Sequence, residues 1–207
     1  LQDRSDLRLS DVAFTLTARR EFRERRAVLC SGLGDAVDAL QVSNDRRRVV
    51  GASAATVEPG VAFMFAGGGA QYPGMGWSLY ESERVYRDTM EECLGLLDRE
   101  SSQTIRALLS GDRSSAELGR RLERPSLSLP ALLASQVAMA RLATSWGLAP
   151  AAMLGHSMGE YTAAHLAGVF SLRDALRLVQ VRGQLFEQVP RGGMLGVPLP
   201  ADTARGL

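Results

Sequence analysis

Apolar residues recur along the chain at two spacings, one typical of helices and one typical of strands. In the first quarter of the chain, this pattern predicts helices at 9–16 and 33–42 and a strand at 25–30. The stretch 51–60 is small and polar and contains both Pro and Gly, which is typical of a boundary between domains. We therefore expect a small α+β part over residues 1–57 and a second part over residues 58–207.

The second part has longer apolar runs. Residues 61–66 are all apolar, which is typical of a strand that is buried on both faces. We expect Pro130 in the first turn of a long helix, Gly147 at its end, and Met139 and Trp146 in the core. Ser171 is the expected cap of the last long helix. The apolar spacing predicts helices at 82–98, around 105–109, around 118–122, at 129–146 and at 172–185, and a further strand beginning at 193–197.

A G-x-S-x-G pentapeptide lies between an apolar run and a helical pattern. Its glycines are Gly155 and Gly159, its serine is Ser157, and the run 149–154 precedes it. Strand, sharp turn and helix in this order are typical of a nucleophile elbow, in which a strained turn exposes the serine hydroxyl. The N–H groups at the start of the following helix point towards an oxyanion that forms on the substrate.

The buried strand leads into a second glycine-rich loop at 67–76. It is no phosphate-binding P-loop, because no Gly-Lys-Ser/Thr follows. It is no dinucleotide-binding fingerprint either, because Tyr72 occupies the place of the third glycine. Two interpretations remain open at this point: the loop supplies backbone N–H groups for half of an oxyanion hole, or it is a plain turn between a strand and a helix.

A serine nucleophile needs a general base within hydrogen-bond reach. The chain has no lysine, and its histidines are His156 and His165. On a strand and turn, His156 points away from its neighbour Ser157. His165 lies two helical turns further on, about 12 Å along the axis. Either Ser157 is not a nucleophile, or its base lies outside these 207 residues.

Composition excludes several other functions. The formal net charge of +1 gives no electrostatic reason to expect nucleic acid or an anionic membrane as a partner. No apolar run approaches about 18 residues, so we expect no membrane span. Cys30 and Cys93 are expected to be buried free thiols of a cytoplasmic protein, and no spacing suggests a metal site. The first residue is not Met, which suggests a chain that starts inside a longer product.

Several motifs together resemble one family, the acyltransferase domains of type I polyketide synthases, which are related to malonyl-CoA:acyl-carrier-protein transacylases. Residues 63–71 (FMFAGGGAQ) with 74–76 (GMG) resemble its first glycine motif, and 155–161 (GHSMGEY) resembles its elbow. Val181-Arg182-Gly183 resembles its later arginine motif. Residues 11–26 resemble the linker that joins the ketosynthase to the acyltransferase.

The resemblance implies a role for each matching residue. Ser157 would take the acyl group from coenzyme A as an ester, and the backbone N–H groups of Gly68 and Met158 would form the oxyanion hole. Gly68 departs from the family pattern, which usually has Gln there. Arg182 would bind the free carboxylate of a malonyl-type unit through its planar guanidinium. Met158, an apolar residue after the serine, favours malonyl over methylmalonyl.

The resemblance also implies a fold and partners. The fold would be α/β: an incomplete α/β-hydrolase-like large subdomain over 58–207, with most of a ferredoxin-like small subdomain absent, after a linker over 1–57. Malonyl-CoA would be the donor, and the phosphopantetheine thiol of an acyl carrier protein the acceptor, beside a ketosynthase domain. No cofactor is expected. The catalytic histidine would lie beyond Leu207, so the fragment alone would be inactive. The alternatives are a serine esterase or thioesterase, and a catalytically silent scaffold.

Overall fold

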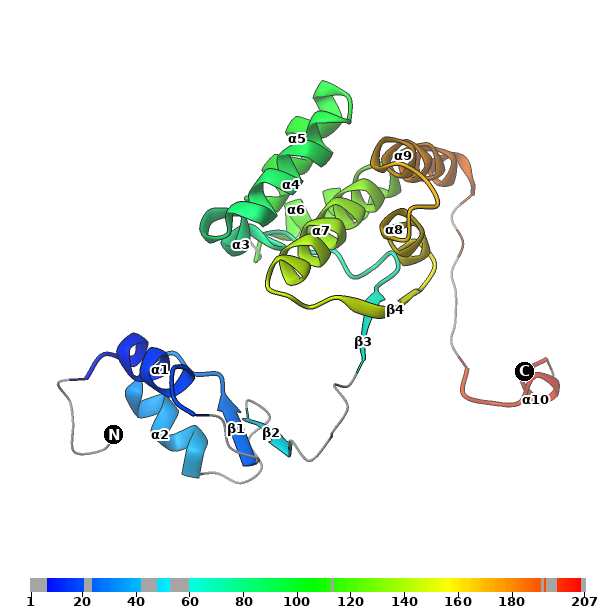
Figure 1. The fold of residues 1–207 in the computed structure, drawn as a ribbon. Helices are drawn as coiled ribbons and strands as arrows, with labels where there is room; N and C mark the ends of the chain where they lie inside the picture. Colours follow the sequence, from blue (N-terminus) through cyan, green and yellow to red (C-terminus); the bar gives the residue numbers. More distant parts are fainter. Residues whose placement is uncertain are drawn as a thin grey trace. The chain divides into compact units, whose positions relative to one another are not determined.

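Figure 1 shows the fold in a computed structural model, which describes residues 7–20, 24–41, 48–52, 60–112, 114–190, 192 and 197–205. The chain divides into two compact units, Leu1–Pro59 and Gly60–Leu207, close to the boundary expected from the sequence. The expected strand at 193–197 falls almost entirely outside the described residues. Helix α10 (Ala201–Ala204), which the sequence did not predict, is the last described element.

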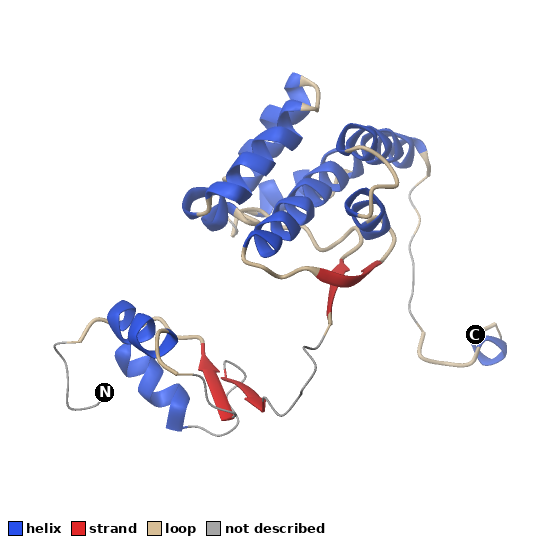
Figure 2. Ribbon diagram, in the orientation of Figure 1, coloured by secondary structure: helices blue, strands red, loops and turns tan. Residues whose placement is uncertain are grey.

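The first unit combines two helices with a two-stranded antiparallel sheet (Figure 2). The predicted helices and strand are confirmed to within two residues, and the second strand was not predicted. Among the residues of this unit whose burial the structure describes, 7–20 and 27–41, only Ala36 and Ala39 are buried. Its elements are α1 (Leu9–Thr17), β1 (Glu24–Val28), α2 (Leu33–Gln41) and β2 (Arg48–Ala52).

Helix α7 (Pro125–Ser145) forms the centre of the second unit and packs against α4, α5, α6, α8 and α9 (Figure 1). Among the described helices, α7 alone is long and apolar enough to cross a membrane by length and composition. However, 72% of its most apolar window is buried inside the unit. Most of the helix is apolar because other helices pack around it, as in the core of a large domain.

The start of α7 differs from the sequence expectation. The helix begins at Pro125 rather than at 129, so Pro130 lies inside it and not in its first turn. Pro125 occupies the first position of the helix, a start signal that the sequence analysis did not use. The Glu187 carboxylate of another helix also accepts a hydrogen bond from the Ser126 N–H at 3.0 Å, and this distant contact leaves no local signal in the sequence.

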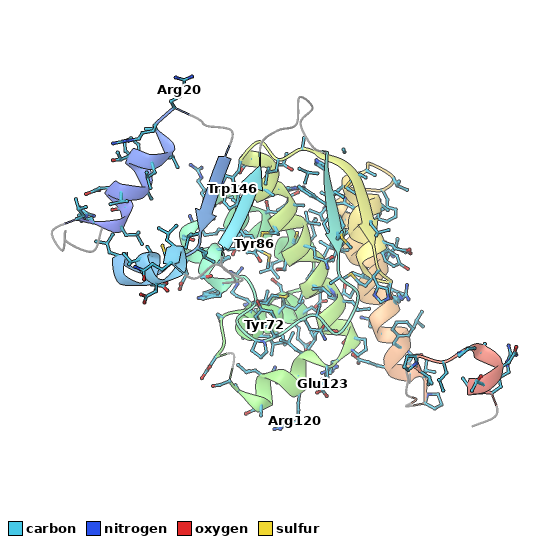
Figure 3. The ribbon with its side chains drawn as sticks, turned by 90° about the horizontal axis from the view of Figure 1, so that it is seen from below. Arg20, Tyr72, Tyr86, Arg120, Glu123 and Trp146 are labelled. Carbon is cyan, nitrogen blue, oxygen red and sulfur yellow. The ribbon has the colours of Figure 1, made fainter. Side chains whose placement is uncertain are left out.

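The helices before α7 also differ in part from the expectation. The predicted helix at 82–98 is shorter, because Glu83 is extended and separates α4 (Arg84–Gly95) from α3 (Trp77–Ser82). The helices α5 (Arg99–Leu109) and α6 (Ala116–Leu122) are confirmed. Tyr86 of α4 is buried, and its hydroxyl hydrogen-bonds the Ser135 hydroxyl of α7 at 2.8 Å, which ties these two helices together (Figure 3).

Strands β3 (Val61–Phe65) and β4 (Pro150–Gly155) pair in parallel, with Phe65 opposite Gly155. The strand expected at 61–66 is confirmed, but its full burial is wrong, because Met64 is 76% exposed. Within the described residues the sheet has only these two strands, and one of its faces is uncovered because the paired residues Met64 and Leu154 are both exposed. The apolar composition matches a strand with both faces covered.

The expected burial of Met139 and Trp146 is also wrong. Met139 is 45% exposed and lines an open hollow of ≈ 270 Å³ beside β3, and Trp146 is 60% exposed at the end of α7 (Figure 3). Both lie towards the C-terminal part of α7, where fewer described elements cover the helix. The predicted end of α7 is confirmed, since Gly147 follows it with φ 91°.

Helices α8 and α9 come directly after β4. Helix α8 (Gly159–Leu166) starts directly after the turn that contains Ser157. Helix α9 (Leu172–Gln188) is capped as predicted, because the Ser171 hydroxyl accepts a hydrogen bond from the Asp174 N–H at 3.1 Å. Both helices pack on α7.

Candidate active site

The parallel pairing of β3 and β4 brings the two glycine motifs together. The His156 N–H, just after β4, donates to the Phe65 carbonyl at the end of β3, at 2.9 Å. A Cβ placed on Gly67 would lie 3.3 Å from the Ser157 Cβ and 2.6 Å from the His156 Nδ1. The loop that starts at Gly67 therefore lies directly against the turn that carries Ser157.

The turn itself has the strained geometry of an elbow. Ser157 has φ 51°, and no other non-glycine residue in the described part of the chain has a positive φ. Such a conformation costs about 1–3 kcal/mol and persists only where the surroundings enforce it. The side chain is exposed. The predicted order of strand, sharp turn and helix is thus confirmed, whereas the nucleophilic role of Ser157 stays a prediction.

The glycines of the pentapeptide are required by close packing. A Cβ on Gly159 would lie 2.1 Å from the Phe65 carbonyl oxygen, and one on Gly155 would lie 2.2 Å from the Glu160 nitrogen. Real Cβ atoms essentially never come that close. Backbone therefore packs on backbone here, and the position of Ser157 is fixed by main-chain contacts rather than by side chains.

The backbone N–H groups of Gly68 and Met158, the expected oxyanion donors, have no hydrogen-bond partner among the described residues. Gly68 is next to Gly67 in the loop, and Met158 is the N-cap of α8. Backbone N–H groups without a partner near an exposed serine are suited to bind a negatively charged oxygen. The loop is anchored beyond them, because the Gly69 N–H donates to the Gln71 Oε1 at 2.8 Å.

The side chain of Met158 is 1% exposed and belongs to the hydrophobic core. It therefore packs beneath the elbow. Its expected influence on the choice between malonyl and methylmalonyl stays a prediction. Such an influence would have to act through the packing under Ser157.

Arg182 of α9 is held by aromatic side chains. Its Nη1 donates to the Tyr161 hydroxyl at 2.8 Å, and its Cζ lies 5.5 Å from the Tyr161 ring centre and 5.0 Å from the Phe186 ring centre. Tyr161 is in the first turn of α8, so it links the elbow helix to Arg182. Sequence reasoning missed Tyr161 and Phe186, although Tyr161 is the last residue of the elbow motif.

The half-buried Arg182 makes no ion pair with a carboxylate in the part of the chain that the structure describes. The next residue, Gly183, fixes the helix in place: a Cβ there would lie 2.4 Å from the Pro125 carbonyl oxygen. Helix α9 therefore packs closely on the start of α7, while the donors of Arg182 other than the one bonded to Tyr161 have no partner among the described residues.

Neither histidine hydrogen-bonds Ser157. The His165 Nδ1 is 3.1 Å from the Phe170 carbonyl, which places this ring at the α8–α9 connection. His156 is exposed, and its Nδ1 lies near Gly67. Among the described residues, no side chain hydrogen-bonds the Ser157 hydroxyl. The source of the base therefore stays a prediction.

The remaining candidate groups are the thiols. Cys93 is buried as expected, and burial raises the pKa of its thiol to about 12, so it stays protonated. Cys30 is only partly buried, which corrects the expectation for that residue. Within the described ranges, no group of three or more His, Cys, Asp or Glu residues is arranged to hold a metal ion.

Residues 62–206 match the family model described as "Acyl transferase domain". The chain belongs to this acyl transferase family. A relative, the spectinabilin polyketide synthase system protein NorB of Streptomyces orinoci, is 39% identical over 209 residues. These cover 100% of this chain and 10% of the relative. The identification of a polyketide synthase acyltransferase from the motifs is thus confirmed.

Solved acyltransferase structures agree with the observed fold. The acyl transferase domain of ZmaA has a TM-score of 0.83 and 38% identity, over 100% of this chain and 48% of that one. A malonyl-transacylase solved in complex with a type II polyketide synthase acyl-carrier protein has a TM-score of 0.55 and 33% identity, over 65% and 41%. The mixed α/β fold class is confirmed, and the chain spans about half of the ZmaA domain.

Proposed function

We propose that this chain provides the nucleophile half of an acyltransferase domain that moves a malonyl-type unit from coenzyme A to an acyl carrier protein. The observation that carries the proposal is the geometry of Ser157. Its φ of 51° puts the exposed hydroxyl on a strained turn, next to the Met158 N–H and against the loop that carries the Gly68 N–H, and neither N–H has a partner among the described residues. A carboxylate-binding arginine is linked to the same helix through Tyr161.

In the first step, the Ser157 Oγ attacks the thioester carbonyl carbon while its proton passes to a general base. The carbonyl π electrons move to the oxygen, and the Gly68 and Met158 N–H groups bind this oxyanion, each contributing roughly 10² to 10³ in rate. The carbon–sulfur bond then breaks. Coenzyme A leaves as the thiol after it takes up the proton, and the acyl group stays on Ser157 as an ester.

In the second step, the phosphopantetheine thiol of the carrier protein gives its proton to the base, and its sulfur attacks the carbonyl carbon of this ester. The carbon–Oγ bond then breaks, the Ser157 Oγ takes up the proton from the base, and the unit is then a thioester of the carrier. In both steps, Arg182 binds the free carboxylate of the unit through two parallel N–H···O bonds. The base is a histidine from outside the 207 residues, since His165 is engaged with Phe170 and His156 makes no side-chain hydrogen bond to Ser157.

Further parts of the proposal concern the whole protein. Residues 1–57 form part of the linker between a ketosynthase and the acyltransferase, and residues 58–207 form part of an α/β-hydrolase-like large subdomain. A ferredoxin-like small subdomain completes the domain. The parent protein acts in the cytoplasm, and malonyl-CoA is its donor. The fragment alone shows little or no turnover because it lacks the base.

The test uses the intact protein that contains this chain. It is incubated with radiolabelled malonyl-CoA, quenched, and then chased with carrier protein that bears phosphopantetheine. We expect a labelled Ser157 peptide and rapid transfer of the label to the carrier. Ser157→Ala abolishes both signals, whereas Ser110→Ala, a matched change on the exposed end of α5, leaves them unchanged. Fast release of free malonate without transfer would instead identify a hydrolase and refute the proposal.

A further inference from the structure

A polar side chain in the middle of α7 links the two halves of the site. Gln136 lies between core residues of this helix. Its Nε2 donates to the Ala66 carbonyl at 2.7 Å, and its Oε1 accepts from the Thr162 hydroxyl at 2.7 Å. Ala66 directly precedes the glycine loop, and Thr162 belongs to α8. Gln136 is therefore bonded both to the loop and to the elbow helix.

The direction of these hydrogen bonds is fixed by their partners. A carbonyl oxygen only accepts, so the amide nitrogen of Gln136 must face Ala66. Its amide oxygen then faces Thr162, whose hydroxyl must donate. Thr162 is 0% exposed, so water does not replace its partner, and leaving its hydroxyl unpaired would cost about 1–3 kcal/mol. The amide of Gln136 therefore has one favourable orientation.

The bond to Ala66 acts on the backbone that leads to Gly68. The Ala66 carbonyl belongs to the same peptide plane as the Gly67 N–H, and the Gly68 N–H belongs to the next plane. Three consecutive glycines allow many backbone conformations, so an external contact has to select one. The preceding carbonyl, that of Phe65, is held by the His156 N–H at 2.9 Å. The elbow thus holds one carbonyl of this segment, and Gln136 holds the next.

We infer that Gln136 is a positioning residue of the acyl transfer reaction. It orients the start of the glycine loop relative to α8, so that the Gly68 N–H stays in place as an oxyanion donor beside Ser157. Gln136 does not touch the acyl group. This inference rests on the proposed function, because it needs an oxyanion that forms at Ser157.

The effect appears in kcat rather than in KM, because the oxyanion exists only in the transition state and the tetrahedral intermediate. Loss of an oxyanion donor costs roughly 10² to 10³ in kcat, so a displaced donor should cost about 10- to 100-fold. Substrate binding through the distant carboxylate should be nearly unchanged.

The experiment compares two variants in the intact protein. Gln136→Met removes both hydrogen bonds at similar volume, and we expect kcat for malonyl transfer to fall about 10- to 100-fold with KM unchanged within about threefold. In Gln136→Glu, a protonated carboxyl can replace the amide as donor to Ala66, whereas the carboxylate cannot. Its kcat relative to the unmodified protein should therefore rise as pH falls, whereas that of the Met variant should not.

Gln180→Met is the matched control. Gln180 of α9 also makes two side-chain hydrogen bonds, to Asp98 and Ser101, but it has no contact with the glycine loop. We expect it to change thermal stability without changing kcat. A folded Gln136→Met protein with kcat within threefold of the unmodified protein would overturn the inference, and so would a loss confined to KM.

A second measurement separates this inference from the proposed function. The rate at which Ser157 reacts with a fluorophosphonate depends on the elbow and the oxyanion hole, and it requires neither malonyl-CoA nor a carrier protein. If the unmodified protein reacts with this probe but transfers no malonyl group, the proposed function fails. The inference about Gln136 is judged separately. It stands if the Gln136→Met protein reacts with the fluorophosphonate at least tenfold more slowly than the unmodified protein, and it fails otherwise.

Discussion

The elbow around Ser157 and the cluster around Arg182 are built in opposite ways. At the elbow, backbone packs on backbone, and a Cβ on Gly159 would meet the Phe65 carbonyl oxygen at 2.1 Å. Around Arg182, long side chains meet near the surface, and the Phe186 ring is still 48% exposed. The backbone contacts at the elbow leave little room for another conformation. The cluster around Arg182 can adjust by rotation of its side chains.

The difference suits the two tasks that we propose. Bond formation at Ser157 requires the reacting atoms within a few tenths of an ångström of one geometry, and a strained backbone turn supplies that accuracy. Attraction between a guanidinium and a carboxylate decreases slowly with distance, so a side-chain cluster is accurate enough. Substitutions at the elbow should therefore cause abrupt losses, and those in the cluster should cause graded ones.

The largest effect is expected for Gly159→Ala. The added methyl group overlaps the end of β3, so either the strand or the start of α8 must move. Overpacking of this kind costs about 1–3 kcal/mol of folding free energy. Because Ser157 moves with the turn, we also expect its fluorophosphonate reaction to slow at least about 100-fold, as when an oxyanion donor is lost. Urea denaturation and labelling rates measure the two effects.

Gly119→Ala is the control for that prediction. Gly119 lies within α6, and nothing lies within 4 Å of a Cβ placed there. Alanine is the better helix former by about 0.8–1 kcal/mol, so this variant should be slightly more stable and fully reactive. Equal behaviour of the two alanine variants would contradict the backbone packing described for the elbow.

Arg182→Lys should have the second largest effect. Lysine keeps the charge but loses the planar pair of donors and the contacts with both rings. We expect kcat/KM for malonyl-CoA to fall about tenfold, equivalent to 1.4 kcal/mol. Activity with acetyl-CoA, which lacks the carboxylate, should be unchanged. Arg177→Lys, at an exposed position of the same helix, is the control and should change neither rate. If Arg182→Lys lowered activity equally with malonyl-CoA and with acetyl-CoA, the proposed binding of the carboxylate by Arg182 would be refuted.

Tyr161→Phe tests the side-chain cluster more finely. The substitution removes the hydroxyl that accepts from Arg182 and keeps the ring beneath the guanidinium. The contact is partly solvated, so we expect a two- to fivefold fall in kcat/KM, or about 0.5–1 kcal/mol. The effect should vanish when Arg182 is already Ala, because the hydroxyl then has nothing to orient. A loss that persists in this double variant would give Tyr161 another role.

The same contrast explains what the sequence could predict. The elbow depends on glycines spaced within one pentapeptide, so its strand, turn and helix were predictable from local sequence. The contacts of Gln136 join α7 to residues 70 positions before it and 26 after it, and no local pattern shows them. The start of α7 was misplaced because Pro125, a local start signal at the first helical position, was not used, and because the contact with Glu187 is distant in sequence. The exposure of Met64 was missed because the sequence of an apolar strand does not show which of its two faces other helices and strands cover.

The smallest effect is expected for Glu187→Gln. Hydrogen bonding from Ser126, through its hydroxyl and then its N–H, together with Arg124, holds the pKa of the Glu187 carboxyl below its usual value. Because this pKa is lowered by folding, the contact stabilises the folded protein at pH values above the unfolded-state pKa of about 4.3. This stabilisation is lost as the pH falls through the folded-state pKa. At neutral pH the variant should lose about 1 kcal/mol or less, as for a helix cap.

Urea denaturation at pH 7 and near pH 3.5 measures this difference, which should shrink at the lower pH. Glu123→Gln, at an exposed residue of the α6–α7 connection, should show no such change (Figure 3). Malonyl transfer by Glu187→Gln should be unaffected, because the contact of Gly183 with the Pro125 carbonyl still fixes α9 on α7. If transfer instead falls with stability, then side chains rather than backbone contacts hold α9 in place, and the contrast between the two regions is smaller than the structure indicates.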